Sequence, residues 1–116
     1  MNSIRTILAS KGQDAQSMEI GESVKVAPDS QAVMPIFIEK TDDRELCVAH
    51  YHTQAGDLMS DPEVHFELDG NDWTPIRYIQ DPGIEREDPA GLDLDGFLEI
   101  WDRNLRRQGF INLTGE

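Results

Sequence analysis

All three histidines of the chain lie in one stretch, Val48 to Gly70, which reads VAHYHTQAGDLMSDPEVHFELDG. His50 and His52 are two residues apart, so on a strand they would project from one face and could share a metal ion. A third ligand would be needed, and His65 is the obvious one. Period-two alternation places His50 with the core residues of its strand but puts His65 on the outer face of the next strand. The sequence therefore predicts no metal site; His50 and His52, its only candidates, are expected to be partly buried, hydrogen-bonded strand residues.

The same stretch holds oxygen ligands and a thiol, but their spacing does not predict catalysis. Asp57, Asp61 and Glu63 lack the spacing of an EF-hand calcium loop. Cys47 and His50 are three residues apart, and on a strand they point to opposite faces, so a nucleophile–base pair is not expected. The sequence contains no nucleophile elbow, phosphate-binding glycine loop or dinucleotide fingerprint. We therefore predict a non-enzymatic protein with no catalytic residue and no cofactor, in which Cys47 is a buried structural thiol.

Hydropathy periodicity predicts the elements that must position these residues. Apolar residues at helical spacing predict a short N-terminal helix that ends near Gly12. Period-two alternation then predicts about five strands, joined closely enough to form an antiparallel meander. Their ranges are 18–26, 34–40, 45–52, 62–69 and 73–80. Pro75, in the last of them, predicts an edge position or a point where no ladder donor is needed.

The C-terminal part returns to helical periodicity. Residues 81–91 are rich in proline, glycine and acid, and they predict an irregular acidic loop. One apolar helical stripe follows, formed by Leu94, Phe97, Leu98, Trp101 and Leu105. The predicted fold class is α+β. A single globular domain, residues 1–116, contains an antiparallel meander of about five strands with a short N-terminal helix and a longer amphipathic C-terminal helix packed on one face.

Charge is the most unusual bulk property of the chain. There are 23 acidic and 10 basic residues, a formal net charge of −13. The acidic segment 57–102 contains fourteen of the acids and only two basic residues, Arg77 and Arg86. Direct binding to nucleic acid or to an anionic membrane is not expected, because both attract basic patches. No apolar run is long enough to cross a bilayer, the N-terminus lacks a secretory h-region and Cys47 is the only cysteine, so we expect a cytoplasmic protein.

Three segments, VAHYHTQAGDLMSDPEVHFEL, WTPIRY and FLEIWDRNLRRQGF, resemble a family of small proteins of unknown function encoded by bacteria, phages and plasmids. The shared pattern is Gly-Asp-Leu-Met, then Asp-Pro-Glu, then a helix with Trp that ends in Gln-Gly-Phe. The resemblance covers roughly residues 44–110, and Gly56-Asp57 and Asp61-Pro62 contribute most of its specificity. His52 stands where such proteins are expected to have tyrosine or another residue, which argues further against a metal site. The family has no known chemistry, and the resemblance implies only a mobile-element origin.

The acidic segment leads to the main functional hypothesis, an interaction protein that docks on a basic protein surface. In its sharper form the protein mimics nucleic acid and inhibits a nucleic-acid-binding defence complex, since duplex DNA carries roughly one charge per 1.7 Å of axis. Mimicry predicts that the acids of Asp81–Asp88 form one patch with those of Asp57–Asp72 or of the last helix. The predicted partner-binding residues are Asp57, Asp61, Glu63, Glu67, Asp69, Asp72, Asp81, Glu85, Glu87 and Asp88.

Three alternatives to this hypothesis stay open. The acidic charge could serve solubility or growth at high salt. A small metal- or ligand-binding domain, or an enzyme, could be centred on His50, His52 and the Gly56–Asp61 loop. A homodimer could seal the edge strand that contains Pro75 against its copy.

Overall fold

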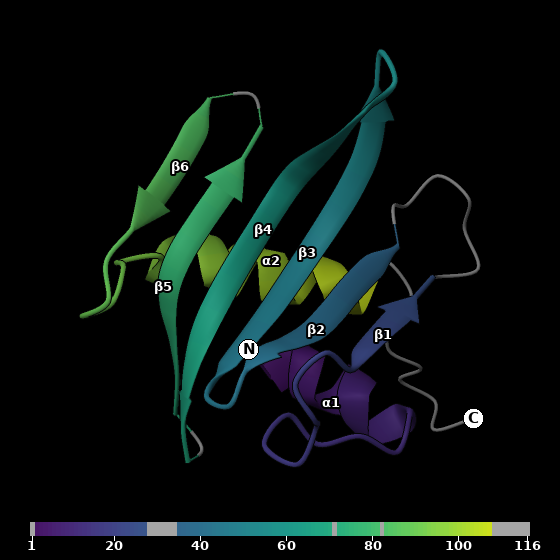
Figure 1. The fold of residues 1–116 in the computed structure, drawn as a ribbon, viewed down its shortest axis with the longest axis vertical. Helices are drawn as coiled ribbons and strands as arrows, with labels where there is room; N and C mark the ends of the chain where they lie inside the picture. The colour runs from purple at the N-terminus through teal and green to yellow at the C-terminus, as the bar shows by residue number, and fades with distance from the viewer. Residues whose placement is uncertain (1, 28–34, 71, 82, 108–116) are drawn as a thin grey trace.

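The chain folds into one antiparallel sheet and two helices (Figure 1). The computed structural model describes residues 2–27, 35–70, 72–81 and 83–107. The elements are α1 (Asn2–Ser10), β1 (Ser23–Val26), β2 (Ile36–Asp42), β3 (Glu45–Gln54), β4 (Asp57–Asp69), β5 (Asp72–Gln80), β6 (Ile84–Glu87) and α2 (Asp95–Arg107). The six strands lie side by side in chain order, so the sheet is a meander and the predicted α+β class is confirmed. Neither described helix is long and apolar enough to span a membrane.

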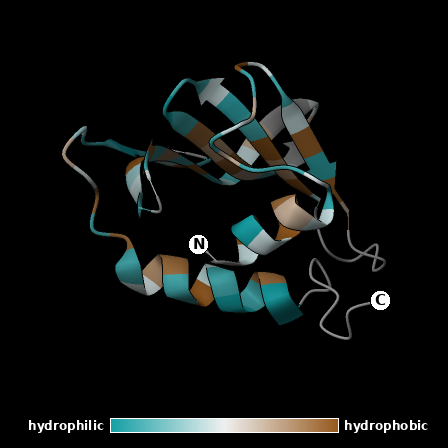
Figure 2. Cartoon of the chain, turned by 90° about the horizontal axis from the view of Figure 1, so that it is seen from below, coloured by the Kyte–Doolittle hydropathy of each residue, from teal (hydrophilic) through white to brown (hydrophobic). Residues whose placement is uncertain are grey.

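Both helices cover the same face of the sheet (Figure 2). Each strand turns alternate side chains to that face, and Val48, Val64 and Phe66 are fully buried there. The predicted apolar stripe of α2 packs in the same core, in which Trp101 and Leu105 are buried. The opposite face of the sheet has no described helix on it.

One charged side chain lies inside this core. Lys40 follows Ile36 and Ile38 in the alternation of β2, and it is 1% exposed. Its Nζ donates hydrogen bonds to the carbonyls of Ala15, at 2.5 Å, and Gln16, at 3.4 Å. These main-chain acceptors offset the desolvation of the ammonium group. Lys40 thereby anchors the segment between α1 and β1 to the sheet.

The sixth strand lies within residues 81–91, for which the sequence predicts an irregular loop. β6 pairs with β5 from Gln80↔Ile84 to Arg77↔Glu87. All four residues of β6 are exposed, so Ile-Glu-Arg-Glu has no apolar alternation that could reveal a strand. The loop prediction is therefore wrong for Ile84–Glu87, and the strand count is six rather than five.

The extra strand also changes the position of Pro75. β5 lies between β4 and β6, so it is not the edge strand that the sequence suggests. However, β6 pairs only with residues 77–80, and on the outer side of Pro75 the Leu92 amide donates to its carbonyl at 2.7 Å. Pro75 thus lies beyond the end of β6, where its missing N–H interrupts no ladder. The alternative of a homodimer that pairs two copies along β5 therefore loses its basis, because β6 occupies the edge of β5 that such a dimer would use.

The predicted Gly56–Asp61 loop is mostly strand. Two residues, Ala55 and Gly56, join β3 to β4, and their φ angles are 52° and 88°. Positive φ at both central residues is typical of the I′ turn, whose twist matches that of a hairpin. Glycine adopts this conformation without a steric penalty. β4 therefore begins at Asp57, directly after the turn.

A bulge in the same hairpin changes the direction of one side chain. Ala49 pairs with Glu63 and Tyr51 pairs with Ser60, so two residues of β4 stand opposite one residue of β3. The extra residue inverts the alternation of β4 on one side of the bulge. As a result Ser60 and Glu63 share a face although they are three positions apart, and the Ser60 hydroxyl donates to Glu63 at 3.0 Å.

One carboxylate joins the two helices. Asp102 of α2 accepts hydrogen bonds from the Ser3 amide, at 2.8 Å, and from the Ser3 hydroxyl. The Ser3 amide is at the N-terminal end of α1, where backbone donors lack helical partners and negative charge is favoured. Burial raises the pKa of Asp102, but the bonds from Ser3 and the charge of Arg106 outweigh burial and leave the pKa below its usual value.

Replacing Asp102 by asparagine removes the charge with little change of shape. We expect D102N to lower the free energy of unfolding by about 1 kcal/mol at neutral pH, because bonds to a charged acceptor are the stronger ones. The folded-state pKa lies below the unfolded value of about 3.9. The stabilisation is therefore present above that pH and is lost as the pH falls through the folded pKa.

Urea unfolding of the parent and D102N should show a constant gap above about pH 5 that closes on acidification. E99Q, which changes an exposed acid of the same helix, is the matched control and should show no such gap. A D102N gap that persists unchanged under acid conditions would contradict the role of the charge.

Candidate functional site

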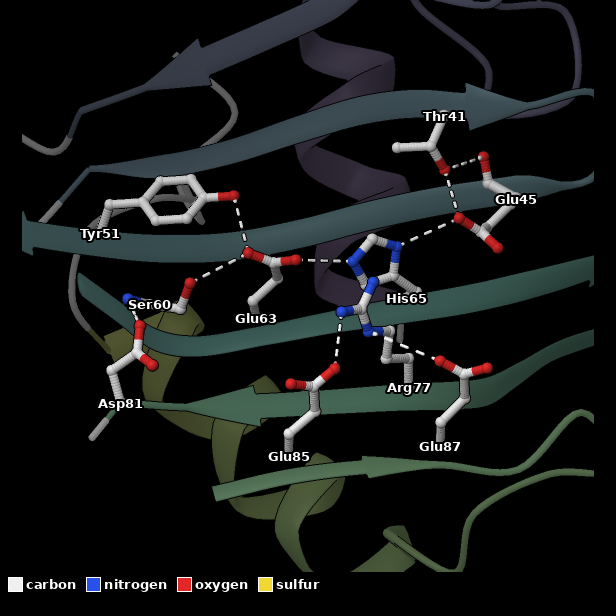
Figure 3. Close-up of polar contacts among 10 residues, drawn as sticks. All are labelled: Thr41, Glu45, Tyr51, Ser60, Glu63, His65, Arg77, Asp81, Glu85 and Glu87. Atoms are coloured by element: carbon white, nitrogen blue, oxygen red, sulfur yellow. Dashed lines mark hydrogen bonds and ion pairs between the residues drawn. The ribbon is translucent and has the colours of Figure 1, made fainter. Parts of the chain in front are cut away.

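The face of the sheet opposite the helices carries a row of polar side chains. The strand register aligns Glu39, Cys47, His65, Arg77 and Glu87 on five adjacent strands. Neighbouring strands are about 4.8 Å apart, so side chains in such a row can reach one another. Figure 3 shows side chains of this face in front of the sheet, with the helices behind it. We call this surface the open face; it also includes Lys25, Thr41, Glu45, Tyr51, Ser60, Glu63, Glu67 and Glu85.

His65 lies near the centre of the open face, between two glutamates (Figure 3). Its Nδ1 is 3.1 Å from Glu45 Oε2, and its Nε2 is 2.6 Å from Glu63 Oε2. Ionised carboxylates only accept hydrogen bonds, so both ring nitrogens donate and the ring is an imidazolium. Burial favours the neutral ring, but the interactions with Cys47, Glu63 and Glu45 outweigh burial and raise the pKa of His65 to about 10.

Glu63 is held from both sides. Its Oε2 accepts from His65, while its Oε1 accepts from the Tyr51 hydroxyl at 3.1 Å and from the Ser60 hydroxyl at 3.0 Å. The bond with His65 is the main cause that lowers the pKa of Glu63, with burial acting against it and Ser60 adding to the lowering. Burial, followed by the nearby Cys47 and Glu63, raises the pKa of the Tyr51 phenol. Glu63 is therefore an ionised carboxylate whose orientation three side chains define.

Cys47 completes this group. It is the cross-strand partner of His65 on β3, and it is 6% exposed. Potential ligand atoms of Cys47, Glu63 and His65 all lie within 4.8 Å of one another. Within the described ranges, no other group of three or more cysteine, histidine or acidic side chains converges in this way. The open face therefore brings a thiol, an imidazole and a carboxylate to one point.

Arg77 extends the network toward the edge of the sheet. Its Nη2 is 2.6 Å from Glu85 Oε1, and its Nε is 3.7 Å from Glu87 Oε2. The hydrogen bond with Glu85 is the main cause that raises the pKa of Arg77. All three side chains are more than one-third exposed, so water screens these pairs and they contribute little to stability. Their effect is to order the charges of β6.

His50 is not part of this group. It faces the helices, where its Nδ1 is 3.1 Å from the Pro35 carbonyl and its ring centroid is 5.8 Å from that of Trp101. His50 and His65 thus lie on opposite faces, as the alternation predicts, and they cannot share an ion. The side chain of His52 lies outside the described residues.

The neighbour of Cys47 is a histidine that sequence reasoning did not pair with it. From the sequence alone, the histidine considered as a partner of Cys47 is His50 on the same strand. The structure instead places Cys47 beside His65 on the next strand. The sequence does contain one sign of this contact: Cys47 and His65 each alternate with core residues along their strands, which places both on the outer face of the sheet. Alternation thus assigns the two residues to the same face, but it does not determine the strand register that makes them neighbours.

The ten acids predicted to bind a partner do not form one patch. Glu63, Glu67, Glu85 and Glu87 share the open face, so acids from residues 81–88 and 57–72 do meet across β5. The remaining described acids lie away from the centre of this face. Asp69 and Asp72 flank the β4–β5 turn. Toward the opposite end of the sheet, Asp61 accepts a hydrogen bond from the Gln80 side chain and Asp81 accepts one from the Ser60 amide. Asp88 follows β6 and accepts a hydrogen bond from the Ala90 amide. The side chain of Asp57 lies outside the described residues.

Replacing Glu63 by glutamine keeps the shape of the side chain but removes the charge closest to His65. We expect E63Q to lower the free energy of unfolding by about 1.5–3 kcal/mol, the range for a hydrogen bond to a charged group. E67Q is the matched control: Glu67 is exposed, lies on the same strand two residues beyond His65, and should stay within about 0.5 kcal/mol of the parent. Equal stability of E63Q and E67Q in urea unfolding would contradict the proposed role of Glu63.

Comparison with known proteins assigns the chain to a family. No curated protein and no solved structure matches the chain. A family model described as "Domain of unknown function (DUF6908)" matches residues 2–111, and this range includes both helices and all six strands. The resemblance to a family of unknown function is confirmed, and the match extends beyond residues 44–110. The chain therefore belongs to this family of domains of unknown function, DUF6908.

Proposed function

We propose that this protein is a small non-enzymatic interaction protein that binds a basic surface of a partner through its open face. One observation carries this proposal: glutamates from four strands gather on the single face that no described helix covers. They are Glu39, Glu45, Glu63, Glu67, Glu85 and Glu87. Among the described strand residues of that face, the basic ones are Lys25, His65 and Arg77.

The partner that fits this face best is a nucleic-acid-binding protein, for which the open face stands in for nucleic acid. Carboxylates at i and i+2 of one strand are about 6.8 Å apart, and neighbouring strands are about 4.8 Å apart. Duplex DNA likewise carries charges at intervals of a few ångströms, roughly one per 1.7 Å of axis over both strands. The net charge of −13 adds long-range attraction to a basic channel.

The charges of the open face are also held in place. Arg77 bridges Glu85 and Glu87, and His65 bridges Glu45 and Glu63. An ordered array loses less conformational entropy on binding than freely rotating side chains would lose. Because the two bridging cations offset part of the charge, we expect the exposed carboxylates at the rim to make most contacts with the partner.

The sharpest form of the proposal is an inhibitor of a nucleic-acid-binding defence complex in the cytoplasm of the host cell. The mobile-element origin that the family resemblance implies supports this form, since mobile elements benefit from blocking host defence. A solubility role for the same charge makes the opposite prediction, because solubility does not depend on which face carries the acids.

A pull-down with matched charge variants tests the proposal. The full-length protein is the bait, E67Q/E85Q/E87Q removes three exposed acids from the open face, and E19Q/D93N/E99Q removes three exposed acids elsewhere. We expect the parent and the second variant to retain, from host lysate, a protein that itself binds duplex DNA and that salt or competing DNA releases. The open-face variant should retain about tenfold less, which corresponds to about 1.4 kcal/mol shared by three charge contacts.

Equal retention by the two variants would show that binding follows net charge rather than the open face. Retention of no specific protein by the parent would contradict the proposal as a whole and favour the solubility role.

A further inference from the structure

We propose that Cys47, Glu63 and His65 form a binding site for a transition-metal ion, with zinc as the first expectation. Three donors of different type, a thiolate, a carboxylate and an imidazole, converge there from two adjacent strands. This inference does not rest on partner binding, because it concerns the centre of the open face and not its exposed rim.

The strand register builds the site. Cys47 and His65 are cross-strand partners, and Glu63 precedes His65 by two residues and so shares its face. Their potential ligand atoms lie within 4.8 Å of one another. Tetrahedral zinc, with bonds of about 2.0–2.3 Å, holds its ligand atoms roughly 3.3–3.8 Å apart, so small side-chain rotations bring the three donors onto one ion. Paired strands, rather than a loop, fix the site, as precise ligand geometry requires.

The surrounding hydrogen bonds are of the kind that orient metal ligands. Nδ1 of His65 is held by Glu45 at 3.1 Å, which leaves Nε2 on the side of Glu63. Oε1 of Glu63 accepts from Tyr51 and Ser60, which leaves Oε2 on the side of His65. In metalloproteins a carboxylate behind the histidine, and donors behind a carboxylate ligand, fix the ligands in this manner. The metal ion would take the place of the proton between Nε2 and Oε2.

The donor set selects the class of metal. Thiolate and imidazole favour zinc and related first-row ions, whereas calcium and magnesium take oxygen ligands. As in any such site, the metal would be bound by Cys47 as thiolate and by His65 through an unprotonated Nε2. Three protein ligands leave a fourth tetrahedral position, which a water molecule or a further ligand would fill.

Titration of the full-length, metal-free protein with Zn²⁺ in competition with a chromogenic chelator tests this proposal. We expect one Zn²⁺ per chain. Co²⁺, which occupies zinc sites and absorbs light, should give a thiolate-to-cobalt charge-transfer band that C47S abolishes. E63Q and H65Q should weaken Zn²⁺ binding by about tenfold or more. E67Q, which changes an acid of the same strand outside the trio, should bind as the parent does.

A parent protein that binds no stoichiometric Zn²⁺, or a Co²⁺ spectrum without the thiolate band, would overturn the proposal. Undiminished binding by C47S and E63Q would do the same, because it would show that exposed carboxylates hold the ion. Far-UV circular dichroism checks the fold of each variant, and C47S and E63Q decide the question if H65Q does not fold. The E67Q/E85Q/E87Q variant keeps the trio and should bind Zn²⁺ normally, so loss of metal binding and loss of partner binding can be told apart.

Discussion

The contact of His65 with Glu45 and Glu63 stabilises the buried centre of the open face, which no described helix covers. A buried charge is costly unless it is paired and hydrogen-bonded. On the open face an imidazolium meets two carboxylates, and hydroxyl groups from Tyr51 and Ser60 satisfy the remaining oxygen of Glu63. This pairing stabilises the buried centre of the open face, as the apolar contacts of α1 and α2 stabilise the other face.

Periodic burial explains why most of the fold can be predicted from the sequence. The core sides of β3 and β4 follow from alternation, and the core side of α2 follows from the spacing that includes Trp101 and Leu105. β6 has no such period, because all its residues are exposed. β6 forms where the backbone groups of β5 can pair with a further strand and where Arg77 forms ion pairs with Glu85 and Glu87. Neither condition is visible in the local sequence.

The site depends on strand pairing, which alternation does not determine. Cys47 and His65 become neighbours because of the two-residue turn at Ala55-Gly56 and the bulge that lies between this turn and the Cys47–His65 pair. A difference of one residue in either feature would shift the register and place another residue beside Cys47. The faces of the candidate residues could thus be predicted, whereas their contacts required the geometry of one turn and one bulge.

The outer strands of the sheet determine how copies of the chain can meet. β1 and β6 have four residues each, and β6 presents Glu85, Arg86 and Glu87 to solvent. A sheet edge is a template for a further strand, and short, charged edge strands oppose such pairing. Growth by strand addition, the first step toward fibrils, is therefore disfavoured at both sides of the molecule. Both edges of the described sheet are therefore poor templates for a further strand.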